Sequence, residues 1–238
     1  MSSLKRPLAV LAALASVALL AGCGDDDSSA STGTDPGSST SSSSSAPAGE
    51  GTGVSCDYAT DPQGAAKEVE PPPADATVSG QVAVTFATSL GDLKATLDAD
   101  AAPCTVGSIV SLAEQGYFDD TTCHRITTSP GFGVLQCGDP TGTGTGGPGY
   151  TIPDELEQTK DYPAGTLAMA NTGAPNSGGS QFFICYTDTQ LPPSYTVFGT
   201  IDEASNQLVA DAAAAGTADG GPDGAPKTPI DISSVTLD

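Results

Sequence analysis

The chain has 238 residues, and its 29 acidic and 7 basic side chains give a formal net charge of −22 at pH 7. Nucleic-acid phosphates are bound by clustered Lys and Arg, so this charge balance argues against a nucleic-acid partner. We interpret the acidic residues as keeping the protein soluble.

The sequence begins with a basic and then an apolar segment. Lys5 and Arg6 precede an apolar run from Pro7 to Leu20. This run of about 14 residues is shorter than the roughly 20 that a membrane-spanning helix needs. A basic start, a short apolar run and small residues before a cleavage point are typical of an export signal, which we predict for residues 1–22.

The four residues Leu20-Ala21-Gly22-Cys23 resemble a bacterial lipobox, in which the Cys is acylated and becomes the new N-terminus. The alternative is an ordinary signal peptide that happens to end near a Cys. The small residues before Cys23 and the polar residues after it favour the lipobox. Acyl chains on Cys23 would hold the protein at a membrane. We therefore expect an extracytoplasmic protein, lipid-anchored to the outer face of the cell membrane.

Residues 23–76 are predicted to form a disordered tether rich in Ser, Gly, Asp and Pro. Such a segment buries too little apolar surface to offset the entropy cost of ordering it. Cys56 and Tyr58 indicate some local order, which the run Pro71-Pro72-Pro73 ends in an extended stretch.

The folded domain is predicted to cover residues 77–238. Alternating or apolar runs typical of strands lie at 82–88, 93–97, 123–126, 134–137, 166–170, 181–186, 196–201 and 230–237. One helix is expected from Pro103 to a stop at Gly116, and a second over 203–215. Strands in that number, joined by Gly- and Pro-rich loops, favour a mostly β fold, a closed barrel with two helices.

Two neighbouring residues stand out chemically: His124 is the only His, and Arg125 is the only Arg after residue 22. One His without a Cys-x-x-Cys pair does not make a zinc site, so we expect no metal. Residues 142–147 fit Gly-x-Gly-x-x-Gly by letter, but Pro148 follows and prevents a helix that would bind a pyrophosphate. No Gly-x-Ser-x-Gly elbow is present for a serine nucleophile.

Four segments resemble, in order, the signature blocks of cyclophilin-type peptidyl-prolyl isomerases. They are Cys123-His124-Arg125-Ile126, Leu135-Gln136-Cys137-Gly138-Asp139-Pro140, Leu167-Ala168-Met169-Ala170-Asn171 and Gly179-Ser180-Gln181-Phe182-Phe183-Ile184. The resemblance covers roughly residues 80–238. It implies a closed eight-stranded antiparallel barrel with two helices, isomerisation of prolyl peptide bonds, and no cofactor.

The resemblance also assigns the site. Arg125 would be a fixed donor aimed at the prolyl amide. Gln136 would orient Arg125, and Phe183 would form the floor of the proline pocket. The other substrate-binding positions implied are His124, Phe132, Val134, Gly144, Thr145, Ala170, Asn171, Gln181, Leu191 and Tyr195. Taken singly, several of these apolar residues could equally be core.

The sequence departs from the family at three positions in or beside this site. Gly133 stands where the family has a pocket Phe. We expect either that Phe132 replaces that ring or that the pocket is looser than in the family. Gln190 stands in place of the family's frequent Trp, and Tyr195 occupies a position that is often His. Because that Trp contributes to cyclosporin binding in the family, we predict weak inhibition by cyclosporin A.

Five cysteines remain beside Cys23, and in an oxidising compartment four of them are expected to pair. A bridge between Cys104 and Cys123 is one possible connectivity, although spacing cannot decide it.

The expected function is a monomeric peptidyl-prolyl cis-trans isomerase. Its partners would be proline-containing segments of exported proteins, whose folding it would assist at the cell surface. The alternative is a catalytically weak lipoprotein that binds proline peptides or acts as a scaffold.

Overall fold

The structure is a computed structural model that describes residues 52–238. The predicted signal peptide, Cys23 and the first part of the predicted tether lie outside the described residues. No helix within 52–238 is long and apolar enough to cross a membrane.

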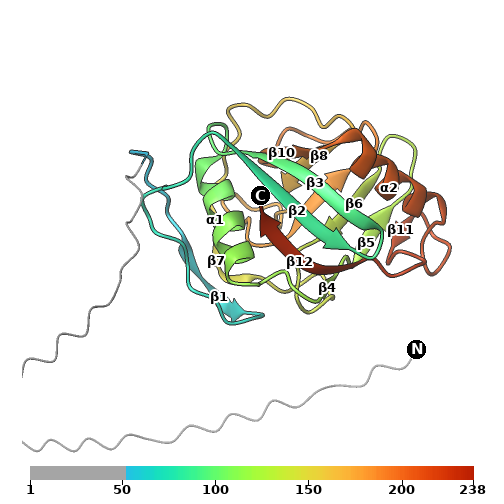
Figure 1. Cartoon of the computed structure of the whole chain (residues 1–238), viewed down its shortest axis with the longest axis horizontal. Coiled ribbons are helices and arrows are strands. Elements are labelled where there is room, and N and C mark those ends of the chain that lie inside the picture. The colour runs from blue at the N-terminus through green and yellow to red at the C-terminus, as the bar shows by residue number, and fades with distance from the viewer. Residues whose placement is uncertain (1–51) are drawn as a thin grey trace, which may run out of the picture. The chain divides into compact units, whose positions relative to one another are not determined.

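One large antiparallel sheet organises the domain (Figure 1). Its strands, in spatial order, are β11 (Asp223–Gly224), β5 (Arg125–Thr127), β6 (Val134–Cys137), β9 (Phe182–Cys185), β8 (Thr166–Met169), β10 (Val197–Ile201), β3 (Gly91–Asp98), β2 (Gln81–Thr88), β12 (Asp231–Leu237) and β4 (Thr121–Thr122). All eight strands predicted from the sequence are present, with ends shifted by no more than two residues. Alternating or fully apolar runs reveal them in the sequence, because each strand buries at least one face.

The sheet is not the closed eight-stranded barrel that we predicted. It has 10 strands, and it is curled into a half-barrel whose edge strands are β11 and β4. These edge strands have only two residues each, too few for the sequence pattern to reveal. The sheet must curl strongly, because only Cys123 and His124 separate β4 at one edge from β5 beside the other.

Two helices flank the sheet at opposite ends (Figure 1). The first, α1 (Pro103–Glu114), has Pro at its start, where the missing N–H costs nothing. The first free N–H groups of α1, those of Cys104 (2.9 Å) and Thr105 (2.8 Å), donate hydrogen bonds to the Glu155 carboxylate. The second, α2 (Glu203–Ala214), is capped by Asp202, which accepts from the Ser205 N–H at 2.7 Å.

Residues 52–76, here called the strap, correct the predicted boundary of the folded domain. We assigned them to the tether, but they form β1 (Ala59–Ala65), which pairs with β7 (Pro148–Thr151) in a second, two-stranded sheet. A disulfide joins Cys56 to Cys104 at the start of α1. Composition did not reveal this order, because distant residues supply it and the strap has little apolar surface of its own.

The cysteine pairing also differs from the connectivity that we considered. Four cysteines do pair, as predicted, but the bridges are Cys56–Cys104 and Cys123–Cys137. The predicted bridge from Cys104 to Cys123 is wrong, since Cys123, in the link between β4 and β5, is bonded to Cys137 on β6 instead. Cys185 is free and buried.

Candidate active site

Four strands place one row of side chains on the same face of the sheet. Arg125 on β5 stands opposite Gln136 on β6, which stands opposite Phe183 on β9, which stands opposite Ala168 on β8. Side chains of directly paired residues in antiparallel strands lie on one face. Their neighbours Leu135, Ile184 and Leu167 point to the other face, into the main core.

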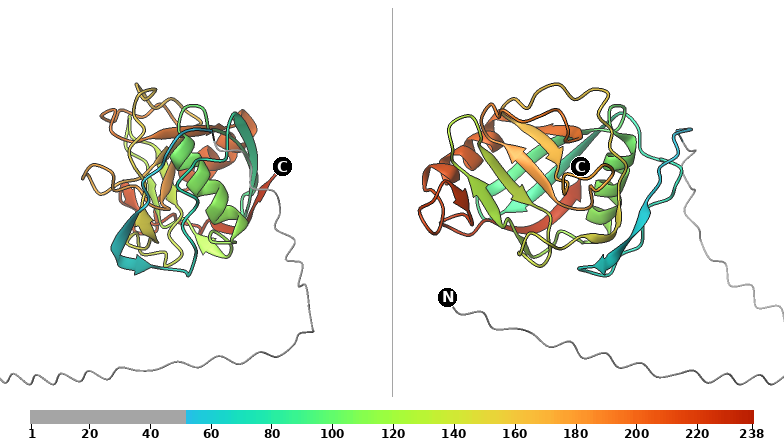
Figure 2. Two further views of the ribbon diagram at one scale, coloured as in Figure 1. Left: turned by 90° about the vertical axis from the view of Figure 1, so that its left-hand side faces the viewer. Right: turned by 180° about the vertical axis from the view of Figure 1, so that it is seen from behind.

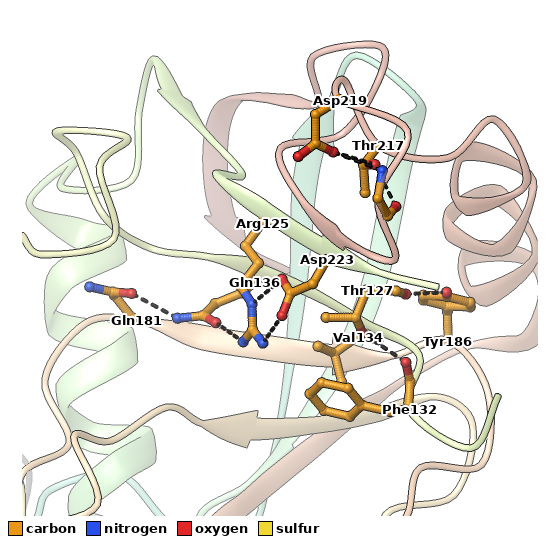
Figure 3. A network of polar contacts seen from close by, with 11 residues as sticks. Arg125, Thr127, Phe132, Val134, Gln136, Gln181, Tyr186, Thr217, Asp219 and Asp223 are labelled. Carbon is orange, nitrogen blue, oxygen red and sulfur yellow. Dashed lines mark hydrogen bonds and ion pairs between the residues drawn. The ribbon is translucent and has the colours of Figure 1, made fainter. Parts of the chain in front are cut away.

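The guanidinium of Arg125 is held at fixed points (Figure 3). Its Nε and Nη2 each donate to a different oxygen of Asp223 at 2.7 Å, and its Nη1 donates to Gln136 Oε1 at 3.1 Å. Hydrogen bonding to Asp223 raises the pKa of Arg125, and the same bond lowers the pKa of Asp223. A guanidinium has five N–H groups, so two remain for a ligand after these three bonds.

A cavity of about 180 Å³ opens beside the guanidinium. Its lining consists of Arg125, Phe132, Val134, Gln136, Ala170, Asn171, Phe183, Leu191 and Tyr195. The rings of Phe183 and Tyr195 are in edge contact, with centroids 5.4 Å apart. An apolar floor with a cation at its rim suits a small apolar ring whose adjacent amide faces the cation.

A second, larger cavity of about 560 Å³ continues from the first. Gln136, Ala170 and Asn171 line both cavities. A polar relay runs along the junction: Gln136 Nε2 donates to Gln181 Oε1 at 2.9 Å, and Gln181 Nε2 donates to the Gly146 carbonyl at 3.0 Å. The larger cavity is therefore an extension of the same groove.

Residues 83–237 match the family of cyclophilin type peptidyl-prolyl cis-trans isomerases. The chain belongs to the cyclophilin family.

Similar proteins agree with this assignment. A probable peptidyl-prolyl cis-trans isomerase B of Mycobacterium tuberculosis is 48% identical over 200 residues, which cover 78% of this chain and 65% of that protein. The chain thus spans about two-thirds of the length of this relative. The peptidyl-prolyl cis-trans isomerase A of the same species is 38% identical over 173 residues, covering 64% of this chain and 90% of that protein.

Solved structures are similar as well. A cyclophilin of Cryptosporidium parvum has a TM-score of 0.57 and 30% sequence identity, and the match covers 66% of this chain and 98% of that one. A second structure of the same protein, determined in the presence of the dipeptide Ala-Pro, has a TM-score of 0.53 and 29% identity, with the same coverage.

The cyclophilin groove gathers nearly every site residue predicted from the sequence. Arg125, Gln136 and Phe183 share the smaller cavity with six of the other positions. Gly144, Thr145 and Gln181 line the larger cavity instead. The right-hand view of Figure 2, which shows the molecule from behind, includes the strands β5, β6 and β9 that carry Arg125, Gln136 and Phe183.

His124 is the predicted site residue that lines neither of these two cavities. It lies under the loop at Gly144, where an added Cβ would stand 3.2 Å from the His124 ring. Its Nδ1 is buried without a hydrogen-bond partner among residues 52–238. Burial lowers the pKa of His124, against the opposing effect of Asp139, so the ring is neutral at pH 7.

The Gly- and Thr-rich loop after Asp139 wraps this buried carboxylate rather than a nucleotide. Asp139 oxygens accept from the N–H groups of Thr141 (2.7 Å), Gly144 (2.7 Å) and Thr145 (3.0 Å). Burial alone would raise the pKa of Asp139, but hydrogen bonds from the Thr141 hydroxyl and the loop backbone lower it overall. The loop with the Gly-x-Gly-x-x-Gly pattern is thus held in place by Asp139 and forms part of the groove wall.

Phe132 occupies the pocket at the point where the sequence departs from the family. Its ring lines the smaller cavity and lies under the Arg125 guanidinium, with the Arg Cζ 5.6 Å from the ring centroid. Gly133 has no room for a side chain, since an added Cβ would lie 2.3 Å from Thr187 Cγ2 and 2.9 Å from Tyr186 Cζ.

Sequence reasoning missed two residues of the site. Asp223 lies in a Gly-Pro-Asp-Gly stretch that indicates only a turn, and it is 98 positions away from Arg125. Tyr162 is buried beneath the pocket, where its hydroxyl donates to the carbonyl of Pro192 at 3.1 Å and accepts from the Tyr195 N–H at 3.0 Å. It therefore supports the pocket loop from below, a role that no local pattern signals.

Proposed function

We propose that this cyclophilin catalyses cis-trans isomerisation of peptide bonds that precede proline. The observation that carries the proposal is the Arg125 guanidinium, held by Asp223 and Gln136 at the rim of an apolar pocket. The naming of its relatives as peptidyl-prolyl cis-trans isomerases supports the same reaction.

The chemistry requires no bond to be made or broken. Partial double-bond character gives the peptide bond a rotation barrier of about 18–20 kcal/mol. In the twisted transition state this resonance is lost, and the prolyl nitrogen gains a free lone pair. A donor already fixed in position stabilises that lone pair without reorganisation, and a dry pocket strengthens the interaction. The two uncommitted N–H groups of Arg125 can supply this donor.

The test is a cis-to-trans proline peptide assay on the full chain beside Arg125→Ala. Loss of a single well-placed donor should reduce kcat/KM by about a hundredfold. Lys227→Ala, which removes an exposed cation outside the groove, is the control and should retain full activity. Near-background rates for both wild type and Arg125→Ala would refute catalysis and favour a protein that only binds proline peptides.

We further propose that the protein acts on exported proteins while lipid-anchored to the outer face of the cell membrane through Cys23. The basic and apolar N-terminal segment and the lipobox-like residues before Cys23 support this location. The two disulfides also favour an oxidising compartment.

Labelling of cells with a palmitate analogue tests the anchor. The full chain should carry the label and fractionate with membranes, whereas Cys23→Ser should lose both properties. Cys185→Ser, which removes a buried thiol in the domain, should keep both. Label retained by Cys23→Ser would contradict the proposed anchor.

A further inference from the structure

The strap forms one wall of the larger cavity. Asp61, Gln63 and residues 64–66 of the strap line this cavity together with the loop at 144–147 and Gln181. The cavity of about 560 Å³ is therefore built from two parts of the chain that are far apart in sequence.

The strap is held against the groove at several points. Ala59 pairs with Thr151 of β7, and the Ala66 N–H donates to the Gly147 carbonyl at 2.8 Å. The Cys56–Cys104 disulfide fixes its start to α1. These attachments fix the backbone of the strap against the groove.

An irregularity in the pairing brings polar groups to the cavity. The register of β1 shifts between Thr60 and Ala65, because five steps along β1 match only two along β7. Bulged strands re-aim side chains and occur beside active sites. The bulge here carries Asp61 and Gln63, both of which line the cavity.

Asp61 is the only charged residue among those that line this cavity. Its Oδ1 accepts the Gln63 N–H at 2.9 Å, which fixes the carboxylate, while its Oδ2 has no hydrogen-bond partner within the described residues. One free carboxylate oxygen in a chain of net charge −22 favours a cationic ligand group.

We propose that the strap turns the larger cavity into a subsite selecting a Lys or Arg side chain near the substrate proline. The two cavities share Gln136, Ala170 and Asn171, so a peptide with proline in the smaller cavity reaches the larger one with an adjacent residue. The inference rests on the proposed function for the identity of its ligand.

NMR titration of the full chain with short peptides measures their binding, and it tests the subsite independently of catalysis. Each peptide contains one Ala-Pro unit, with Lys, Gln or Glu placed in turn at each position flanking that unit. At one of these positions the Lys peptide should bind about two- to fivefold more tightly than the Gln peptide at low salt, and Glu should weaken binding. Added salt should reduce the difference by screening.

Two strap variants complete the test. Asp61→Asn should abolish the preference for Lys, whereas Asp57→Asn should leave it intact, because Asp57 is an exposed acid of the same strap outside the cavity lining. A Lys preference that survives Asp61→Asn, or no preference at any position, would overturn the subsite. Peptides that bind with the Lys preference but are not isomerised would instead contradict only the proposed catalysis.

Discussion

At the scale of single residues, the pairing of Arg125 with Asp223 decides how the cation is presented. A free Arg side chain has many rotamers, and fixing it only when substrate arrives would cost entropy. Two parallel hydrogen bonds to one carboxylate fix the plane of the guanidinium beforehand. Asp223 is thus a positioning residue, which acts on the reaction through Arg125.

Asp223→Ala should therefore lower kcat/KM about three- to tenfold, a modest effect because both partners are partly exposed to solvent. We expect most of the loss in kcat, since the donor matters more for the twisted transition state than for ground-state binding. Asp223→Glu should restore part of the activity. Asp211→Asn on exposed α2 controls for net charge, and an equal loss in that variant would contradict a positioning role.

Gly133 shows why the family's pocket Phe cannot stand at this position in this chain. Gly133→Ala forces a Cβ into Tyr186 and Thr187, so it should lower the free energy of unfolding by about 1–3 kcal/mol. Urea unfolding measures this change. Gly147→Ala is the matched control, since its Cβ would meet nothing within 4 Å. Equal stabilities of the two variants would contradict the close packing at Gly133.

At the scale of elements, the strap depends on a crosslink rather than on its own composition. Cys56 and Cys104 are 48 residues apart, and closing a loop of that length in the unfolded chain is worth about 4 kcal/mol in the chain-entropy model. Replacing both with Ala should lower the free energy of unfolding by about 2–4 kcal/mol. Hydrogen exchange should also show lost protection in β1, whereas β6 and β9 should keep theirs.

The contrast between the strap and the barrel strands explains what the sequence could predict. Strand β2 is recognisable from its alternating apolar and polar residues, and β9 from its fully apolar run, because both patterns lie within the strand's own sequence. The strap is ordered by a disulfide and by pairing with β7, which no local pattern encodes. Likewise, the family resemblance located Arg125 and Gln136, whereas Asp223 lies on the two-residue strand β11, which only the folded sheet brings beside them.

At the scale of the whole molecule, buried and paired groups set how stability responds to acid. Burial lowers the pKa of His124 below its ordinary 6.5, so below that pH the unfolded chain binds a proton that the folded chain does not. Stability is then lost as the pH falls from 6.5 toward the lowered pKa. The pKa values of Asp139 and Asp223 are also lowered, so their contribution is present above 3.8 and is lost as the pH falls through their folded values.

The pH range in which His124 affects stability can be separated from that of the two carboxylates, because His124 is the only His in the chain. The free energy of unfolding, measured in urea from about pH 7.5 to 5.5, should decline for the wild type. His124→Gln should remove this decline but keep the loss of stability below pH 3.8, which belongs to Asp139 and Asp223. Protonation of exposed acids relieves repulsion in a chain of net charge −22 and acts equally on both proteins, so their difference isolates the imidazole. A wild-type stability that rises as the pH falls from 6.5, relative to the variant, would mean that folding favours the charged ring.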